Sequence, residues 1–158
     1  MIKIYCSKTF SKFFDLQVLP EKKQDISILN WSAHSYKIGK RQNLIFVNHL
    51  TFFYFVVFDV TKSNFINIEK LFLENLLKEI EKTNKLNLCD ENLLIEKFKN
   101  LYFLEKSTNK DINYIIVNFV SLIKNFEVLD GITFDSFYAE EDVYNGDSAQ
   151  RFITQILK

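Results

Sequence analysis

The stretch from Leu29 to Val60, LNWSAHSYKIGKRQNLIFVNHLTFFYFVVFDV, decides the fold. It contains three runs rich in β-branched and aromatic residues, at Leu29–Ile38, Leu44–Asn48 and Thr51–Val60. The first two runs are separated only by Gly39-Lys40-Arg41-Gln42. Connections this short join antiparallel neighbours, because parallel strands need a crossover of about a dozen or more residues. The stretch therefore predicts an antiparallel β-meander over residues 29–60.

The segment Phe52–Phe58 is apolar on both faces, which is typical of a central strand that is covered on both sides. Two amphipathic patterns predict helices that cover it, one over residues 64–80 and one over residues 112–126. In the second pattern, Tyr114, Val117 and Leu122 make the helix apolar almost all round. We therefore expect that helix to be the buried, central one.

Local patterns predict the remaining elements. Residues 2–6 alternate with the period of a strand, and residues 102–104 form a second short strand. Asp90 can cap one further helix, and Thr108 and Asp111 have the spacing of a capping box before the helix at 112–126. An amphipathic helix is expected over residues 148–157. Together these elements indicate an α+β fold, in one domain over residues 1–158 because no linker or internal repeat interrupts the chain.

Composition narrows the classes of function. Lys and Arg total 20, as do Asp and Glu, and this balance argues against binding nucleic acid or membranes through bulk charge. The three glycines are too dispersed for a phosphate-binding loop, a dinucleotide fingerprint or a nucleophile elbow. Two cysteines are too few for a disulfide framework, and lysines occupy the N-terminal positions where a secretory signal is apolar. We expect a cytoplasmic protein without a cofactor and without a membrane partner.

The clearest feature outside the core is an acidic segment at residues 125–147. Residues 1–124 hold 18 basic and 13 acidic residues, whereas residues 125–158 hold 2 basic and 7 acidic ones. One interpretation is a solvated loop that keeps a Phe-rich protein in solution. The other is a docking surface for a protein partner with a basic surface. Its candidate binding residues are Asp135, Tyr138, Glu140, Glu141, Asp142 and Tyr144.

The predicted hairpin carries a resemblance to a known family. The chain has Trp31-Ser32-Ala33, then the basic turn Lys40-Arg41, then an apolar strand that ends at Asn48 and is followed by Thr51. With Thr108-Asn109-Lys110 further on, this order resembles a family of small bacterial proteins of uncharacterised function, over about residues 1–124. Gln42 and Lys110 depart from it, since the family more often has a basic residue at the first position and Arg at the second. The resemblance implies a fold and leaves function open.

The same hairpin offers a candidate chemistry. Trp31, Lys40 and Arg41 could contact nucleic acid through stacking and phosphate neutralisation, and His34, His49 and Arg41 could form a catalytic set for RNA cleavage without metal. The alternative is structural: Trp31 anchors the core, both histidines are hydrogen-bonded, and the basic turn is solvated. No spacing of cysteines, histidines or carboxylates indicates a metal site.

The sequence therefore favours a non-enzymatic interaction or regulatory protein, of the kind that mobile elements and phages encode. It would bind a basic protein through the acidic segment, as a nucleic-acid mimic or an inhibitor of a bacterial defence nuclease. The alternative function is an RNA-binding or RNA-cleaving protein that uses Trp31, His34, Arg41 and His49.

Overall fold

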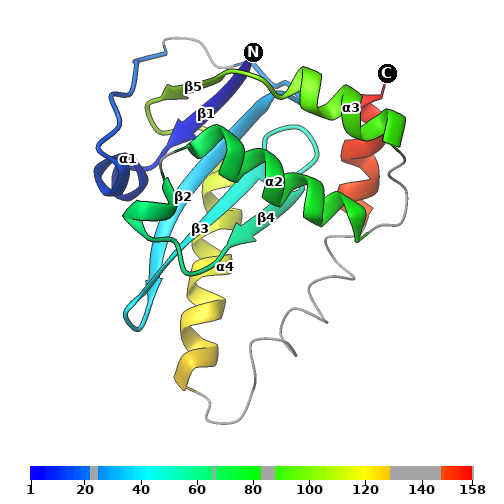
Figure 1. Cartoon of the computed structure of the whole chain (residues 1–158). Helices are drawn as coiled ribbons and strands as arrows, with labels where there is room; N and C mark the ends of the chain where they lie inside the picture. Colours follow the sequence, from blue (N-terminus) through cyan, green and yellow to red (C-terminus); the bar gives the residue numbers. More distant parts are fainter. Residues whose placement is uncertain (22–24, 66, 83–87, 129–146, 158) are drawn as a thin grey trace.

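The computed structural model describes residues 1–21, 25–65, 67–82, 88–128 and 147–157. Its centre is a five-stranded sheet in the order β4-β3-β2-β1-β5 (Figure 1). The strands are β1 (Ile2–Cys6), β2 (Asn30–Ile38), β3 (Arg41–Asn48), β4 (Tyr54–Val57) and β5 (Leu101–Leu104). The sequence prediction of an α+β fold is confirmed.

The meander is present, but the sheet is mixed. Strands β2, β3 and β4 pair antiparallel, as expected from their short connections. Strand β1 pairs in parallel with β2 on one side and with β5 on the other. A parallel neighbour requires a crossover, and the chain from β1 to β2 provides one with the helix α1 (Lys8–Phe14). Ser7 caps α1 by accepting a hydrogen bond from the backbone of Phe10.

The segment Phe52–Phe58 lies at the edge of the sheet, so the expectation of a central strand is wrong. Within this segment residues 54–57 form the strand β4, which pairs with β3 and with no other described strand. Phe55 nevertheless faces one helical layer at 1% exposure, while Val56 faces the other at 8%. An apolar run indicates that both faces of a segment are buried, and helices can bury both faces of a strand even at the edge of a sheet.

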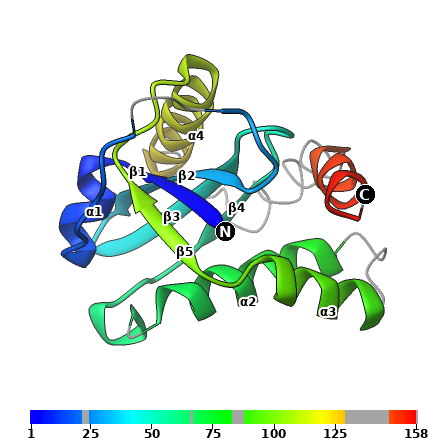
Figure 2. The ribbon, with the colours of Figure 1, turned by 90° about the horizontal axis from the view of Figure 1, so that it is seen from above.

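One face of the sheet is covered by α2 (Ile68–Glu81), α3 (Leu88–Lys97) and a C-terminal helix at residues 147–156. Figure 2 shows α2 and α3 on this side of the sheet and α4 on the other. Helix α2 begins at Ile68 and not at residue 64, because Asn67 caps it and the 3-10 helix η1 (Lys62–Phe65) precedes it. Its buried stripe is Phe72, Leu76 and Ile80.

Helix α4 (Lys110–Val128) covers the opposite face. Its stripe of Ile112, Ile116, Phe119 and Ile123 is buried against β2, β3 and β4. Tyr114 and Val117 are 69% and 63% exposed, so α4 is an outer layer and not a buried central helix. Asn109 caps it, since its Oδ1 accepts hydrogen bonds from the backbone of Asp111 and Ile112. The capping box at Thr108 and Asp111 is thus replaced by an Asn109 cap.

Candidate functional site

Trp31 lies in the core. It is 0% exposed, and its ring meets those of Phe72 and Phe152 edge to face at centroid distances of 5.3 and 5.4 Å. Alternate residues of a strand point to opposite faces, so His34 lies on the other face of β2. The structure therefore separates Trp31 from His34, and the Trp31 ring offers no face on which a base could stack.

Asn48 organises the turn between β3 and β4. Its Oδ1 accepts hydrogen bonds from the backbone N–H groups of Leu50 and Thr51 and from the Thr51 hydroxyl, each at 3.1 Å. Its Nδ2 donates to the carbonyl of Ile28 at 2.8 Å. Asn48 is 0% exposed, so these bonds satisfy a fully buried amide. Asn48 and Thr51, two residues that carry the family resemblance, thus build the turn.

The parallel register brings polar residues together beyond the carboxyl end of β1. Cys6 of β1 pairs with Ala33 of β2, so the next residues along, Ser7 and His34, are neighbours. The backbone N–H of Ser7 still donates to the carbonyl of Ala33 at 2.9 Å. Lys106 follows β5 on the other side of β1. Open sheets commonly bind ligands at this position, beyond the carboxyl ends of parallel strands.

A pocket of about 340 Å³ opens at this end of β1, and we call it the strand-end pocket. It lies between the carboxyl end of β1, the middle of β2 and the side of α4. Its polar lining includes Ser7, Ser32, His34, Lys106 and Asn113. Its apolar lining is Ala33, Ile116, Val117 and Val120. Helix α4 thus contributes apolar side chains and Asn113, and the strands and the loop after β5 contribute further groups that can form hydrogen bonds.

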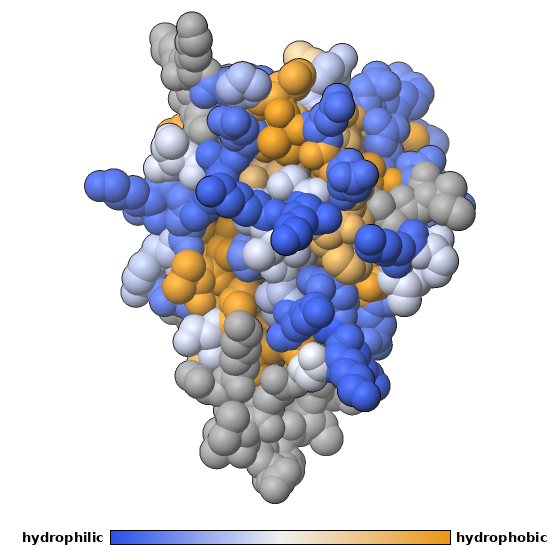
Figure 3. Space-filling model, turned by 90° about the vertical axis from the view of Figure 1, so that its left-hand side faces the viewer, coloured by the Kyte–Doolittle hydropathy of each residue, from blue (hydrophilic) through white to orange (hydrophobic). Residues whose placement is uncertain are grey.

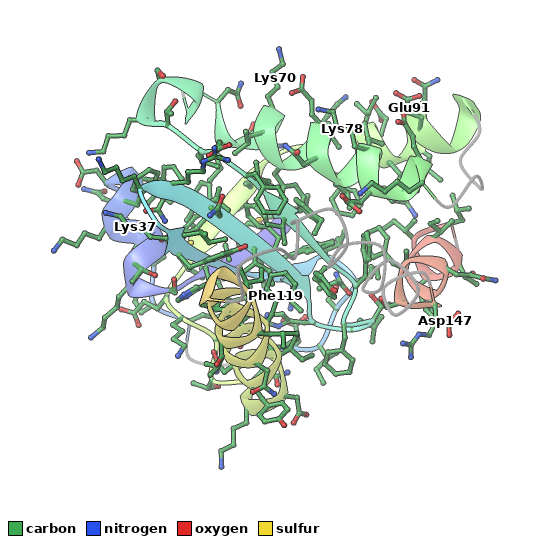
Figure 4. The ribbon with its side chains drawn as sticks, turned by 90° about the horizontal axis from the view of Figure 1, so that it is seen from below. Lys37, Lys70, Lys78, Glu91, Phe119 and Asp147 are labelled. Atoms are coloured by element: carbon green, nitrogen blue, oxygen red, sulfur yellow. The ribbon has the colours of Figure 1, made fainter. Side chains whose placement is uncertain are left out.

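A second pocket of about 540 Å³ adjoins the first, because His34 and Val120 line both. We call it the lysine pocket, after Lys12 of α1, Lys37 of β2 and Lys62 of η1. Figure 3 shows the α1 side of the molecule as mainly hydrophilic, with hydrophobic residues exposed between the polar ones. Figure 4 shows Lys37 near α1, well away from Lys70 and Lys78 on α2.

The charges around the two pockets are of one sign. Lys12, Lys37, Lys62 and Lys106 are all exposed, and none forms an ion pair with another described residue. Among the described residues that line either pocket there is no Asp or Glu. The charged residues that line the pockets in the described part of the chain are therefore all basic, although the whole chain is neutral.

A hydrogen-bonded network lies behind the strand-end pocket. Ser32 Oγ is 2.9 Å from His49 Nε2, and the His49 ring stacks on Tyr5 at a centroid distance of 4.9 Å. The Tyr5 hydroxyl donates to the carboxylate of Glu21, which also accepts from Lys3 Nζ at 2.7 Å. Tyr5 and Ser32 line the pocket, whereas His49 is not among its described lining residues. The network fixes the wall of the pocket from behind.

Burial sets the charge state of this network. It lowers the pKa of His49 to about 4, against the opposing effect of the Glu21 charge. Burial would raise the pKa of Glu21, but the hydrogen bonds from Lys3 and Tyr5 outweigh it and lower that pKa. At neutral pH, His49 is therefore uncharged and Glu21 is ionised.

Tyr36 has a buried hydroxyl without a partner among the described residues. It lines the lysine pocket and is 5% exposed, and its hydroxyl oxygen accepts and donates no hydrogen bond within that part of the chain. Burial raises the pKa of Tyr36, so the hydroxyl stays protonated and can donate. Buried hydroxyls normally have partners, which here points to a water or ligand atom.

The other sequence-predicted residues lie apart from these pockets. Lys40 and Arg41 are exposed at the hairpin turn, where Arg41 forms an ion pair with Asp59 at 3.3 Å. The six candidate residues of the acidic segment, between Asp135 and Tyr144, lie outside the described residues. In the described part of the chain, no cluster of His, Cys, Asp and Glu could hold a metal ion. No helix in the same ranges is long and apolar enough to cross a membrane.

Sequence reasoning found His34 but missed the lysines and serines around it. Lys12 and Lys62 lie in α1 and η1, Lys106 lies in the loop after β5, and no local spacing connects them. The parallel sheet could have indicated Ser7 and Lys106, because Ser7 directly follows β1 and Lys106 comes two residues after β5, which pairs with β1. A prediction of an antiparallel meander alone gives no reason to look at strand ends.

Comparison with known proteins gives one match. A family model described as "Domain of unknown function (DUF6933)" matches residues 3–136. No curated protein and no solved structure matches the chain.

Proposed function

The chain belongs to the DUF6933 family of domains of unknown function, and from the geometry of its two pockets we propose that the protein binds an anionic, phosphate-bearing ligand. The ligand would occupy the strand-end and lysine pockets. The observation that carries this proposal is a set of four lysines around two joined pockets, with no carboxylate among their described lining residues.

Charge supports an anion. The four lysines have no described ion-pair partner, so a ligand anion would not have to displace a carboxylate. Flexible ammonium groups suit phosphate as point charges.

Binding is favoured over RNA cleavage by the geometry around the histidines. Metal-independent cleavage needs a general base and a general acid at the reacting atoms. His34 lines both pockets, but His49 is buried behind Ser32 and its pKa is lowered to about 4. Only one of the two histidines is therefore placed to contact a ligand in the pocket.

The test is isothermal titration calorimetry with inorganic pyrophosphate at low salt. We expect wild type to bind, and Lys37→Glu/Lys62→Glu to weaken binding by about tenfold or more, because it reverses two charges at the site. The matched control is Lys70→Glu/Lys78→Glu, which changes the net charge equally on α2. No binding by wild type, or equal loss in both variants, would overturn the proposal.

A second proposal rests on a different observation, the excess of acidic residues in residues 125–158. We propose that this region docks a basic protein partner in the cytoplasm, as a regulatory or inhibitory contact. The two proposals are compatible, because the acidic segment and the lysines of the pockets are separate parts of the chain.

A further inference from the structure

The two joined pockets differ mainly in charge, since apolar side chains line both of them. The lysine pocket has three of the four lysines, Lys12, Lys37 and Lys62. The strand-end pocket has an apolar wall that includes Ile116, Val117 and Val120. A simple phosphate or pyrophosphate would satisfy the first pocket and leave the apolar wall of the second in contact with water. A ligand with a phosphate at one end and an apolar surface at the other would use both pockets.

We propose that the site binds a nucleoside phosphate, with the phosphates in the lysine pocket and the nucleoside in the strand-end pocket. This inference rests on the proposed function and adds the class of ligand. His34 lines both pockets and would lie at the junction between the nucleoside and its phosphates.

The strand-end pocket suits a nucleobase in size and in lining. Its volume of about 340 Å³ is within the range of small-molecule sites. A base has an apolar face, which the α4 wall can cover, and a hydrogen-bonding edge. The edge would meet the polar groups on the strand side of the pocket, of which Ser32 is already bonded to His49.

Asn113 gives the pocket an acceptor. Its Nδ2 donates to the carbonyls of Ser107 and Asn109, at 3.0 and 2.8 Å, and these bonds fix the amide. Its Oδ1 accepts no hydrogen bond from a described residue. Because Asn113 lines the pocket, this oxygen is available to the amino group of a base.

The alternative ligand with the same groups is single-stranded RNA, which would follow a basic groove over several nucleotides. The pockets favour a single nucleotide. The other basic residues of the hairpin, Lys40 and Arg41, do not line either pocket, and Arg41 is paired with Asp59.

Calorimetry with ADP, pyrophosphate and adenosine tests the inference on the full chain. We expect ADP to bind about tenfold or more tightly than pyrophosphate, since one stacked base contributes on that scale. Adenosine alone should bind more weakly than ADP. If pyrophosphate binds and ADP binds no more tightly, the nucleoside inference is wrong and the anion-binding proposal stands. If neither binds, both are wrong.

A pair of α4 variants locates the base. Ser121→Trp places a large side chain into the strand-end pocket from an exposed position, and Asn118→Trp places one on α4 outside both pockets. We expect Ser121→Trp to reduce ADP affinity by about tenfold or more and to leave pyrophosphate affinity within about twofold. Asn118→Trp should change neither. Equal ADP binding by both variants would overturn the assignment, as would tight binding of a ten-nucleotide RNA by a wild type that does not bind ADP.

Discussion

At the scale of single residues, His49 shows how the fold sets a protonation state. Its ring is 3% exposed, stacks on Tyr5 and is hydrogen-bonded to Ser32. Burial lowers its pKa from an ordinary value of 6.5 to about 4. Between these two values the unfolded chain binds a proton that the folded chain does not, so the free energy of unfolding falls as pH decreases.

We therefore expect wild type to lose about 2 kcal/mol of unfolding free energy from this residue between pH 7 and pH 5. His49→Gln keeps a hydrogen-bonding group and cannot titrate, so its loss over the same interval should be smaller by that amount. Urea unfolding of both proteins at the two pH values measures the difference. Parallel losses in wild type and variant would show that His49 titrates normally in the folded state.

At the scale of elements, β4 is an edge strand whose side chains are packed on both sides. Phe55 is 1% exposed, and its ring contacts those of Phe46 and Phe72 at centroid distances of 5.0 and 5.3 Å. On the other face, Tyr54 contacts Phe119 of α4 at 5.1 Å. The strand therefore joins the two helical layers although it pairs with only one neighbour.

Phe55→Ala should cost about 3 to 5 kcal/mol of unfolding free energy, because it removes a buried ring and leaves a cavity. Phe58→Ala is the matched control, since Phe58 follows the same strand and is 39% exposed. Its cost should be about 1 kcal/mol or less. Denaturant melts with a constant slope m give both values. A loss of under about 1 kcal/mol for Phe55→Ala would mean that β4 is not packed as described.

At the scale of the whole molecule, charge is divided between regions. The four lysines of the pockets lie within residues 1–124, and the acidic excess lies in residues 125–158. The net charge of zero does not reveal this division. The net charge alone therefore does not exclude anionic ligands or basic protein partners.

If the acidic segment docks a basic partner, replacing Glu140, Glu141 and Asp142 with Lys should slow association by about tenfold or more. Added salt should weaken the wild-type complex, since screening limits exposed charges to about 10 Å at 0.1 M. Stopped-flow or surface-binding kinetics with the partner protein measure the association rate and its dependence on salt. The control replaces the exposed Glu74, Glu81 and Glu105 with Lys, an equal change of net charge. Identical rates in the two triple variants would remove the docking proposal.

The sequence by itself determined the elements whose signals are local. The turn Gly39-Lys40 joins β2 to β3 in an antiparallel pair, as the short connection predicts. The 3.6-residue periodicity predicts helices over residues 64–80 and 112–126, and the structure has α2 and α4 there with slightly different bounds. Alternation along β2 was enough to place Trp31 and His34 on opposite faces. These features depend on residues that are close together in the sequence, so they can be predicted from a single sequence.

Only the tertiary structure decided which elements meet. Strand β1 pairs with β5, which lies 99 residues further along the chain, and no local pattern indicates a partner so distant in sequence. The parallel pairing of β1 with β2 and with β5 makes the sheet mixed and brings Ser7, His34 and Lys106 to one pocket. The candidate site follows from this long-range register, because strand pairing is set by the packing of the whole core and not by the residues of one strand.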